Sequence, residues 1–125
     1  MTEMEIYNSI GEEGFTILVS AFYQRVKTDD ILAPMYPADD FVGAEIRLRD
    51  FLIQRFGGPT RYSDQRGHPR LRMRHAPFTI NQAARDRWLL LMTQAASDAN
   101  ITPEVWQLLL PYFVSTANHM MNAPG

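Results

Sequence analysis

One histidine near the middle of the chain has neighbours that suit metal binding. His75 stands in the run Arg70-Leu71-Arg72-Met73-Arg74-His75-Ala76-Pro77-Phe78. A neutral imidazole is a good axial ligand for haem iron, and a nearby backbone carbonyl can orient such a ligand at the end of a short helix. The alternative, a histidine that only hydrogen-bonds to its surroundings, stays open at this point.

Five arginines lie in or next to the same run: Arg61, Arg66, Arg70, Arg72 and Arg74. The guanidinium fork of arginine matches a carboxylate bidentately, so the two propionates of a haem would be natural partners. A solvated basic loop explains the same charges. A phosphate or RNA contact is a third explanation, but the run has no interleaved aromatic residues and no known binding motif to support it.

Tyr23, Tyr36 and Trp88 form a third group of interest. Tyr23 and Trp88 fall on the apolar faces of predicted helices, where each would bury a large ring that carries one polar hydrogen. Donors that face one cavity can hold an oxygen ligand with partial negative charge. The alternative is a set of core aromatic residues bonded to backbone carbonyls.

Composition excludes several other kinds of site. The chain has no cysteine, which excludes disulfides, thiolate metal sites and cysteine nucleophiles. Its net charge of -2 provides no general attraction to nucleic acid or to an anionic membrane. We find no glycine-rich phosphate loop, nucleophile elbow or zinc-spaced histidine cluster. The pairs Asp29-Asp30 and Asp39-Asp40 fall at predicted turns and helix starts, where capping explains them better than acid–base catalysis.

Four long helices are predicted to position these residues. Apolar residues at helical spacing predict the first over 12–27, and Asp39 or Asp40 caps a second that ends at Gly57-Gly58-Pro59. Asn81 caps a third over 81–98, and Thr102-Pro103-Glu104 begins a fourth. Each helix has an expected buried stripe. In the first it is Phe15, Leu18, Val19, Phe22 and Val26, and in the second it is Ala44, Leu48, Phe51 and Leu52, with Ile46 and Ile53 widening it. In the third it is Ala84, Trp88, Leu91, Met92 and Ala95, and in the fourth it is Val105, Leu108, Leu109, Tyr112, Phe113, Thr116, Ala117 and Met120.

The stretch over 57–77 is too polar for a core element and too long for a plain turn, which is typical of a functional loop. A short helix is predicted after Pro69, and Pro77 stops it just after His75. Because the stretch contributes few apolar side chains, something else must fill the space beneath it. A flat apolar cofactor would do so.

These patterns predict one all-α domain over residues 1–125. No run approaches the ~20 apolar residues that a membrane span needs. The N-terminus is acidic and has no apolar stretch of the kind found in signal peptides. The expected location is therefore the cytoplasm.

Several runs together resemble the group II truncated haemoglobins over nearly the whole chain. They are Phe22-Tyr23, Pro34-Met35-Tyr36-Pro37, Gly57-Gly58-Pro59, Tyr62-Ser63, the run from Gly67 to Phe78, Arg85-Asp86-Arg87-Trp88-Leu89 and the tail Asn122-Ala123-Pro124. The resemblance implies a truncated globin fold, a two-over-two helical sandwich around haem b (iron protoporphyrin IX).

The same resemblance implies roles for individual residues. His75 corresponds to the proximal ligand of the iron, and Tyr23, Tyr36 and Trp88 correspond to the distal donors. Ala44 stands where many globins carry a distal histidine, and Leu48 follows one turn later. The residues implied at the haem edge and propionates are Tyr62, His68, Arg72 and Arg74. Two departures, Arg55-Phe56 for a Tyr-Trp pair and Ala84 for an acidic residue, touch packing and helix capping.

Three hypotheses for the function follow. The first is reversible binding and transport of dioxygen, or of nitric oxide or carbon monoxide, at a His75-ligated iron. The second is an enzyme for nitric oxide dioxygenation or peroxide consumption, which would need a separate reductase. The third is a haem-free helical interaction module. Apolar stripes on the last two helices also leave a homodimer open.

Overall fold

The computed structural model describes residues 2–123, and Met1, Pro124 and Gly125 lie outside the described residues, including the last position of the Asn122-Ala123-Pro124 run. Over that range the chain forms helices and no strand, which confirms the predicted all-α class. The long helices are α1 (Ile6–Val26), α2 (Phe41–Arg55), α5 (Gln82–Asp98) and α6 (Pro103–Met120). The short ones are η1 (Glu3–Glu5), η2 (Ala33–Met35), α3 (Arg61–Arg66) and α4 (Leu71–His75).

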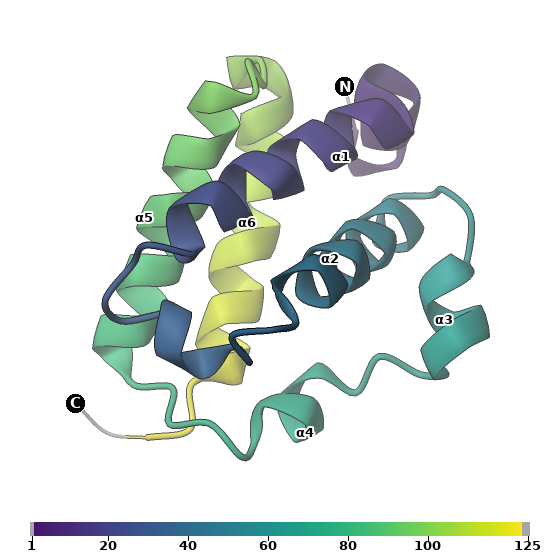
Figure 1. The fold of residues 1–125 in the computed structure, drawn as a ribbon. Helices are drawn as coiled ribbons and strands as arrows, with labels where there is room; N and C mark the ends of the chain where they lie inside the picture. The colour runs from purple at the N-terminus through teal and green to yellow at the C-terminus, as the bar shows by residue number, and fades with distance from the viewer. Residues whose placement is uncertain (1, 124–125) are drawn as a thin grey trace.

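The long helices form two pairs that pack across each other. Helix α1 lies against both α2 and α5, and α5 packs on α6 (Figure 1). The predicted stripes supply the core between them. Side chains that are fully buried there include Phe15, Leu18, Phe22, Leu52, Ile53, Met92, Leu109 and Phe113. The arrangement confirms the two-over-two sandwich.

The polar residues predicted at two helix starts make the expected caps. Asn81 Oδ1 accepts the backbone N–H of Ala84 at 3.0 Å, and Thr102 Oγ1 accepts that of Val105 at 3.3 Å. Each bond satisfies a donor that the first helical turn leaves unpaired. Helix α2 ends before Gly57, whose φ of 102° is a conformation that glycine adopts at little cost.

One predicted helix start was wrong, and one predicted cap does not form. Helix α1 begins at Ile6 rather than at residue 12, and it continues through a kink at Gly11, where φ is 65°. Asp40 occupies the position before α2 but makes no cap bond. Its carboxylate instead accepts a hydrogen bond from Arg47 at 2.9 Å, since the basic side chain in the next turns competes for it.

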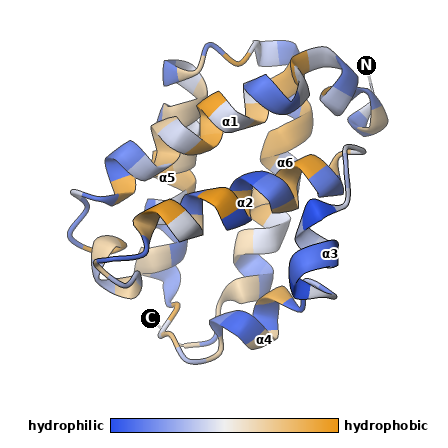
Figure 2. Ribbon diagram, turned by 45° about the vertical axis from the view of Figure 1, so that its right-hand side comes forward, coloured by the Kyte–Doolittle hydropathy of each residue, from blue (hydrophilic) through white to orange (hydrophobic). Residues whose placement is uncertain are grey.

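Residues 57–80, named the proximal segment below, contain two short helices. Helix α4 was predicted, and it ends at His75, two residues before Pro77. Helix α3 was not predicted, because its run of polar residues has almost no apolar face. Tyr62 is nevertheless only 5% exposed and packs edge-on against Phe51 at 5.4 Å between ring centroids. Figure 2 shows both short helices as mostly hydrophilic.

No helix within residues 2–123 combines the length and apolarity that crossing a membrane requires.

Candidate functional site

His75 is the last residue of α4, and its ring is half-buried. Its Nδ1 lies 2.7 Å from the backbone oxygen of Leu71, one turn earlier. Because a carbonyl oxygen can only accept, the hydrogen bond requires the proton on Nδ1. In the neutral ring this leaves the lone pair on Nε2, the atom that would then bind a metal. The expectation that a backbone carbonyl orients the ring is met by Leu71.

A cavity of about 560 Å³ lies beneath the proximal segment, where the sequence predicted a space. Its apolar wall comes from α2, α4 and α6, through Phe51, Leu71, Met73, Tyr112 and Met120. Its rim is basic and includes His68, Arg70 and Arg72. The volume falls within the range of about 300–1,000 Å³ typical of pockets for small molecules and cofactors.

The distal cluster, Tyr23, Tyr36 and Trp88, comes from α1, the residue after η2, and α5. The rings of Tyr23 and Tyr36 meet edge to face with centroids 5.5 Å apart. Trp88 joins this pair through Phe22, which lies 5.3 Å from the Trp88 ring and 5.2 Å from the Tyr23 ring. The structure therefore brings the three predicted residues into one aromatic assembly, with Phe22 at its centre.

Burial sets the protonation of the two tyrosines. It raises the pKa of Tyr23 far above its ordinary value, with a further contribution from the neighbouring Tyr36. Burial also raises the pKa of Tyr36. Both phenols thus keep their protons at neutral and moderately alkaline pH, and each hydroxyl remains able to donate a hydrogen bond.

Helix α2 forms the floor next to the distal cluster. Ala44 is 5% exposed and belongs to the same core as Tyr23, and Leu48 packs against that core one turn later. Ile46 is 40% exposed, so the prediction that it widens the buried face was wrong. Its position between Ala44 and Leu48 turns it away from the core, since alternate residues of a helix point to different sides.

The four residues implied at the haem edge make other contacts here, beginning with Tyr62, which packs against Phe51. Arg74 donates to the carbonyls of Pro69 at 2.7 Å and Arg66 at 2.9 Å. Arg72 donates to the carbonyl of His119 at 2.7 Å. His68 Nδ1 accepts the backbone N–H of Arg70 at 3.2 Å. These side chains fold the proximal segment and fasten it to α6, and a propionate contact by Arg72 or Arg74 stays a prediction.

Asn122 is a functional candidate that the residue-by-residue reasoning missed. Its side chain accepts the backbone N–H of Ile80 at 2.8 Å and donates to the carbonyls of Phe78 at 2.8 Å and His75 at 3.4 Å. Asn122, two residues beyond the end of α6, therefore holds both the end of α4 and the chain that follows it. The one signal in the sequence was its place in the Asn122-Ala123-Pro124 run.

The residues present fit a haem. One imidazole is oriented with its proton on Nδ1, which leaves the Nε2 lone pair for a metal. The cavity beside α4 has an apolar wall and basic side chains, and it is lined by Leu71, Arg72 and Met73 of that helix but not by His75 or by the distal cluster. That combination matches a flat apolar ring with two carboxylates and one axial position on its metal.

Comparison with known proteins gives a consistent result. The family model for the bacterial-like globins matches residues 5–122. A group 2 truncated hemoglobin of Bacillus subtilis is 39% identical over 116 residues, which cover 93% of this chain and 87% of that protein. A group 2 truncated hemoglobin of Lotus japonicus is 33% identical over 92% of this chain and 70% of its own length.

Solved structures agree with the sequence matches. The hemoglobin of the actinobacterium Thermobifida fusca superposes with a TM-score of 0.91 at 48% identity, over 100% of both chains. The group II truncated hemoglobin of Bacillus anthracis superposes with a TM-score of 0.92 at 35% identity, over 96% of this chain and 98% of the other.

Proposed function

Because the chain belongs to the bacterial-like globins and, among them, to the group II truncated haemoglobins, we propose that it holds haem b through His75 and binds dioxygen beside the distal cluster. The observation that carries the proposal is the hydrogen bond from His75 Nδ1 to the Leu71 carbonyl, which leaves Nε2 as the ligand atom. A matched structure from Bacillus subtilis is described as a truncated oxygen-avid haemoglobin, which supports dioxygen as the ligand.

The two sides of the site have different tasks in this proposal. When bound, haem would supply an iron that takes up dioxygen, nitric oxide or carbon monoxide reversibly. His75 holds the ring in place, and Leu71 fixes the direction of the imidazole. Tyr23 and Tyr36 keep their protons, and the Trp88 indole carries a further N–H. These donors stabilise a ligand whose outer atom carries partial negative charge.

Burial at the centre of the aromatic assembly limits the access of water, although Tyr36 and Trp88 are half-buried. Tyr23 is 3% exposed and Phe22 is fully buried. A hydrogen bond gains strength where water does not compete for the donor. Transport of dioxygen, a cytoplasmic location and a separate reductase stay predictions of the sequence.

The test is an absorption spectrum of the purified protein in its ferric, ferrous and oxygenated forms. We expect a haem spectrum in the wild type. His75→Ala should lose tight haem binding, and His75→Gly should regain it when imidazole is added. A wild-type protein that takes up no added haemin would overturn the proposal.

The same samples separate oxygen binding from catalysis. Stoichiometric, reversible uptake of dioxygen is the expected result. Steady consumption of nitric oxide or peroxide with an added reductant would instead favour the enzyme hypothesis.

A further inference from the structure

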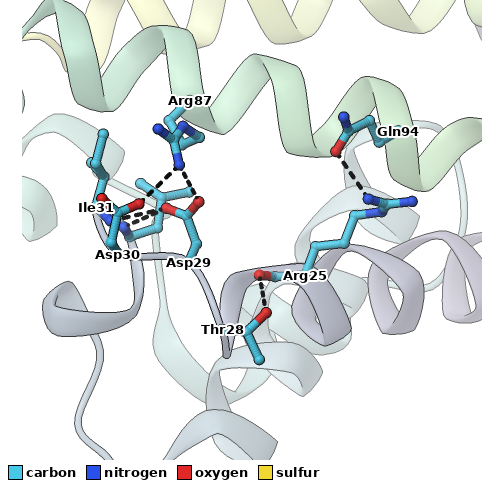
Figure 3. A network of polar contacts seen from close by, with 8 residues as sticks. Arg25, Thr28, Asp29, Asp30, Ile31, Arg87 and Gln94 are labelled. Carbon is cyan, nitrogen blue, oxygen red and sulfur yellow. Dashed lines mark hydrogen bonds and ion pairs between the residues drawn. The ribbon is translucent and has the colours of Figure 1, made fainter.

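An ion pair joins α5 to the turn that follows α1. Arg87 Nη1 lies 2.5 Å from Asp29 Oδ1, and the Asp29 side chain is only 6% exposed. The second carboxylate oxygen of Asp29 accepts the backbone N–H groups of Ile31 at 3.1 Å and Leu32 at 2.9 Å. Figure 3 shows Arg87 reaching from α5 to this turn. One carboxylate therefore shapes the turn and fastens it to α5.

The carboxylate is held in its charged form. Burial alone would raise the pKa of Asp29, but the N–H groups of Leu32 and Ile31 and the Arg87 guanidinium outweigh it and keep this pKa below its ordinary value. Arg87 also contacts Asp30 at 3.1 Å, whose side chain is 85% exposed. Asp29 is thus the partner that can fix the position of Arg87, because an exposed carboxylate is screened by water.

Both residues of the ion pair are close in sequence to residues of the distal cluster. Arg87 immediately precedes Trp88 in α5, and Asp29 lies on the short connection between Tyr23 and Tyr36. Successive side chains of an α-helix point about 100° apart, so Arg87 can reach the turn while Trp88 packs inward on Phe22. A shift of the pair would move Trp88 and the tyrosines relative to each other.

We propose that the Arg87–Asp29 ion pair is a positioning device that sets where the Trp88 indole stands relative to Tyr23 and Tyr36. The inference rests on the proposed function for its effect on ligand binding. Arg87 and Asp29 touch no ligand in this scheme and act through Trp88 and the tyrosines.

The structure offers a matched control in a second ion pair, which joins α1 itself to α5. Arg25 of α1 donates to Asp98 of α5 at 2.8 and 3.0 Å and to Gln94 at 3.0 Å. Figure 3 shows the Arg25–Gln94 contact beside the Arg87 site. Arg25 and Asp98 are 37% and 44% exposed. Arg25 lies two positions after Tyr23 in α1, where side chains do not face each other, and Asp98 lies well after Trp88 in α5. The two arginines therefore separate positioning from general attachment of α1 to α5.

The experiment compares Arg87→Met with Arg25→Met in a Trp106→Phe background, which leaves Trp88 as the only tryptophan. Methionine keeps much of the aliphatic stem and removes the guanidinium. The first readout is the NMR resonance of the Trp88 indole N–H. The second is the dissociation rate of dioxygen from the haem-loaded protein.

We expect Arg87→Met to move the indole resonance and to change the dissociation rate about threefold or more, as loss of a hydrogen bond of ordinary strength would. Arg25→Met should leave both unchanged. An Arg87→Met protein with an unmoved indole resonance, or an Arg25→Met protein with an equal shift, would overturn the proposal.

Two further measurements keep the result interpretable. If Arg87→Met does not fold, Arg87→Lys retains the charge and loses the guanidinium fork, and it should show the same indole shift in smaller measure. If the protein takes up no haem, the proposed function fails, but the indole resonance of the same samples still tests the positioning of Trp88.

Discussion

The distal cluster and the proximal segment are held by different kinds of contact. Around Tyr23, Tyr36 and Trp88, buried and half-buried rings pack on one another at 5.2–5.5 Å between centroids. In residues 57–80, the side chains of Arg72 and Arg74 donate to backbone carbonyls instead, and Asn122 donates to the Phe78 carbonyl from beyond α6. The distal side therefore packs as part of the core, whereas the proximal segment is polar and covers a cavity.

The two sides should therefore respond differently to substitutions. A packed core loses free energy steeply when one ring is removed, because neighbouring side chains cannot fill the space. Hydrogen bonds at the surface contribute about 0.5–1.5 kcal/mol each, and a segment held by them opens locally without unfolding the whole protein. The left-handed backbone of Arg70, with φ of 44°, adds strain to the proximal segment.

The largest effect is expected from removal of a ring at the centre of the distal side. Phe22→Ala should lower the free energy of unfolding by about 3–5 kcal/mol, the usual cost of a large aromatic cavity. Phe78→Ala is the matched change in the proximal segment, where the ring is 41% exposed, and it should cost less than about 1 kcal/mol. Urea unfolding followed by circular dichroism measures both. Equal losses in the free energy of unfolding would contradict the distinction between the distal core and the proximal segment.

The next effect concerns ligand binding by the distal donors. Trp88→Phe keeps an aromatic ring and removes the indole N–H, which is worth about 1.5–3 kcal/mol if it bonds a partly charged ligand. Dissociation of dioxygen should then accelerate by about tenfold or more. Stopped-flow measurement of the rate, with Trp106→Phe as the control tryptophan, decides this. An unchanged rate would take Trp88 out of the ligand-holding role.

A smaller effect is expected in the proximal segment. Asn122→Ala removes the side-chain bonds to Ile80, Phe78 and His75. Amide hydrogen exchange at Ile80 should accelerate by about tenfold, since one to two ordinary hydrogen bonds are lost, while the unfolding midpoint of the core changes little. Asn118→Ala is the control, because the Asn118 side chain accepts a hydrogen bond from Arg85 of α5 rather than bonding to the proximal segment. Similar exchange in the two variants would refute the role of Asn122.

The smallest effect is a negative result at high pH. Burial raises the pKa of Tyr23 and Tyr36, so the folded protein keeps both phenol protons through the ordinary tyrosine pKa of about 10. The stability linked to these protons is complete below that pKa and declines as pH rises from it toward the folded values, because the unfolded chain ionises first. At about pH 10.5 the variant with Tyr23→Phe and Tyr36→Phe should show the same tyrosinate absorbance as the wild type. In urea the variant should absorb less, because it has fewer tyrosines. A difference in the folded state would show that water reaches the distal hydroxyls.

Much of the fold followed from the sequence because it depends on local rules. Apolar residues at helical spacing located the four long helices, and Asn81, Thr102 and Gly57 marked boundaries that the structure confirms. Helix α3 was missed because a single apolar residue, Tyr62, anchors it to Phe51. The early start of α1 was missed because a glycine kink interrupts its pattern.

The residue types available at the site could be identified from the sequence: a histidine two residues before Pro77, Tyr23 and Trp88 on apolar helix faces with Tyr36 in the turns between helices, and an arginine-rich stretch. The sequence could not determine their partners. Leu71 orients His75 because α4 places the Leu71 carbonyl one turn before the imidazole. Asn122 reaches the proximal segment only because α6 ends next to that segment. The pairing of Arg87 with Asp29 spans 58 positions of the chain. Contacts at such separation depend on how helices pack, which no local pattern encodes, so the tertiary structure alone decided them.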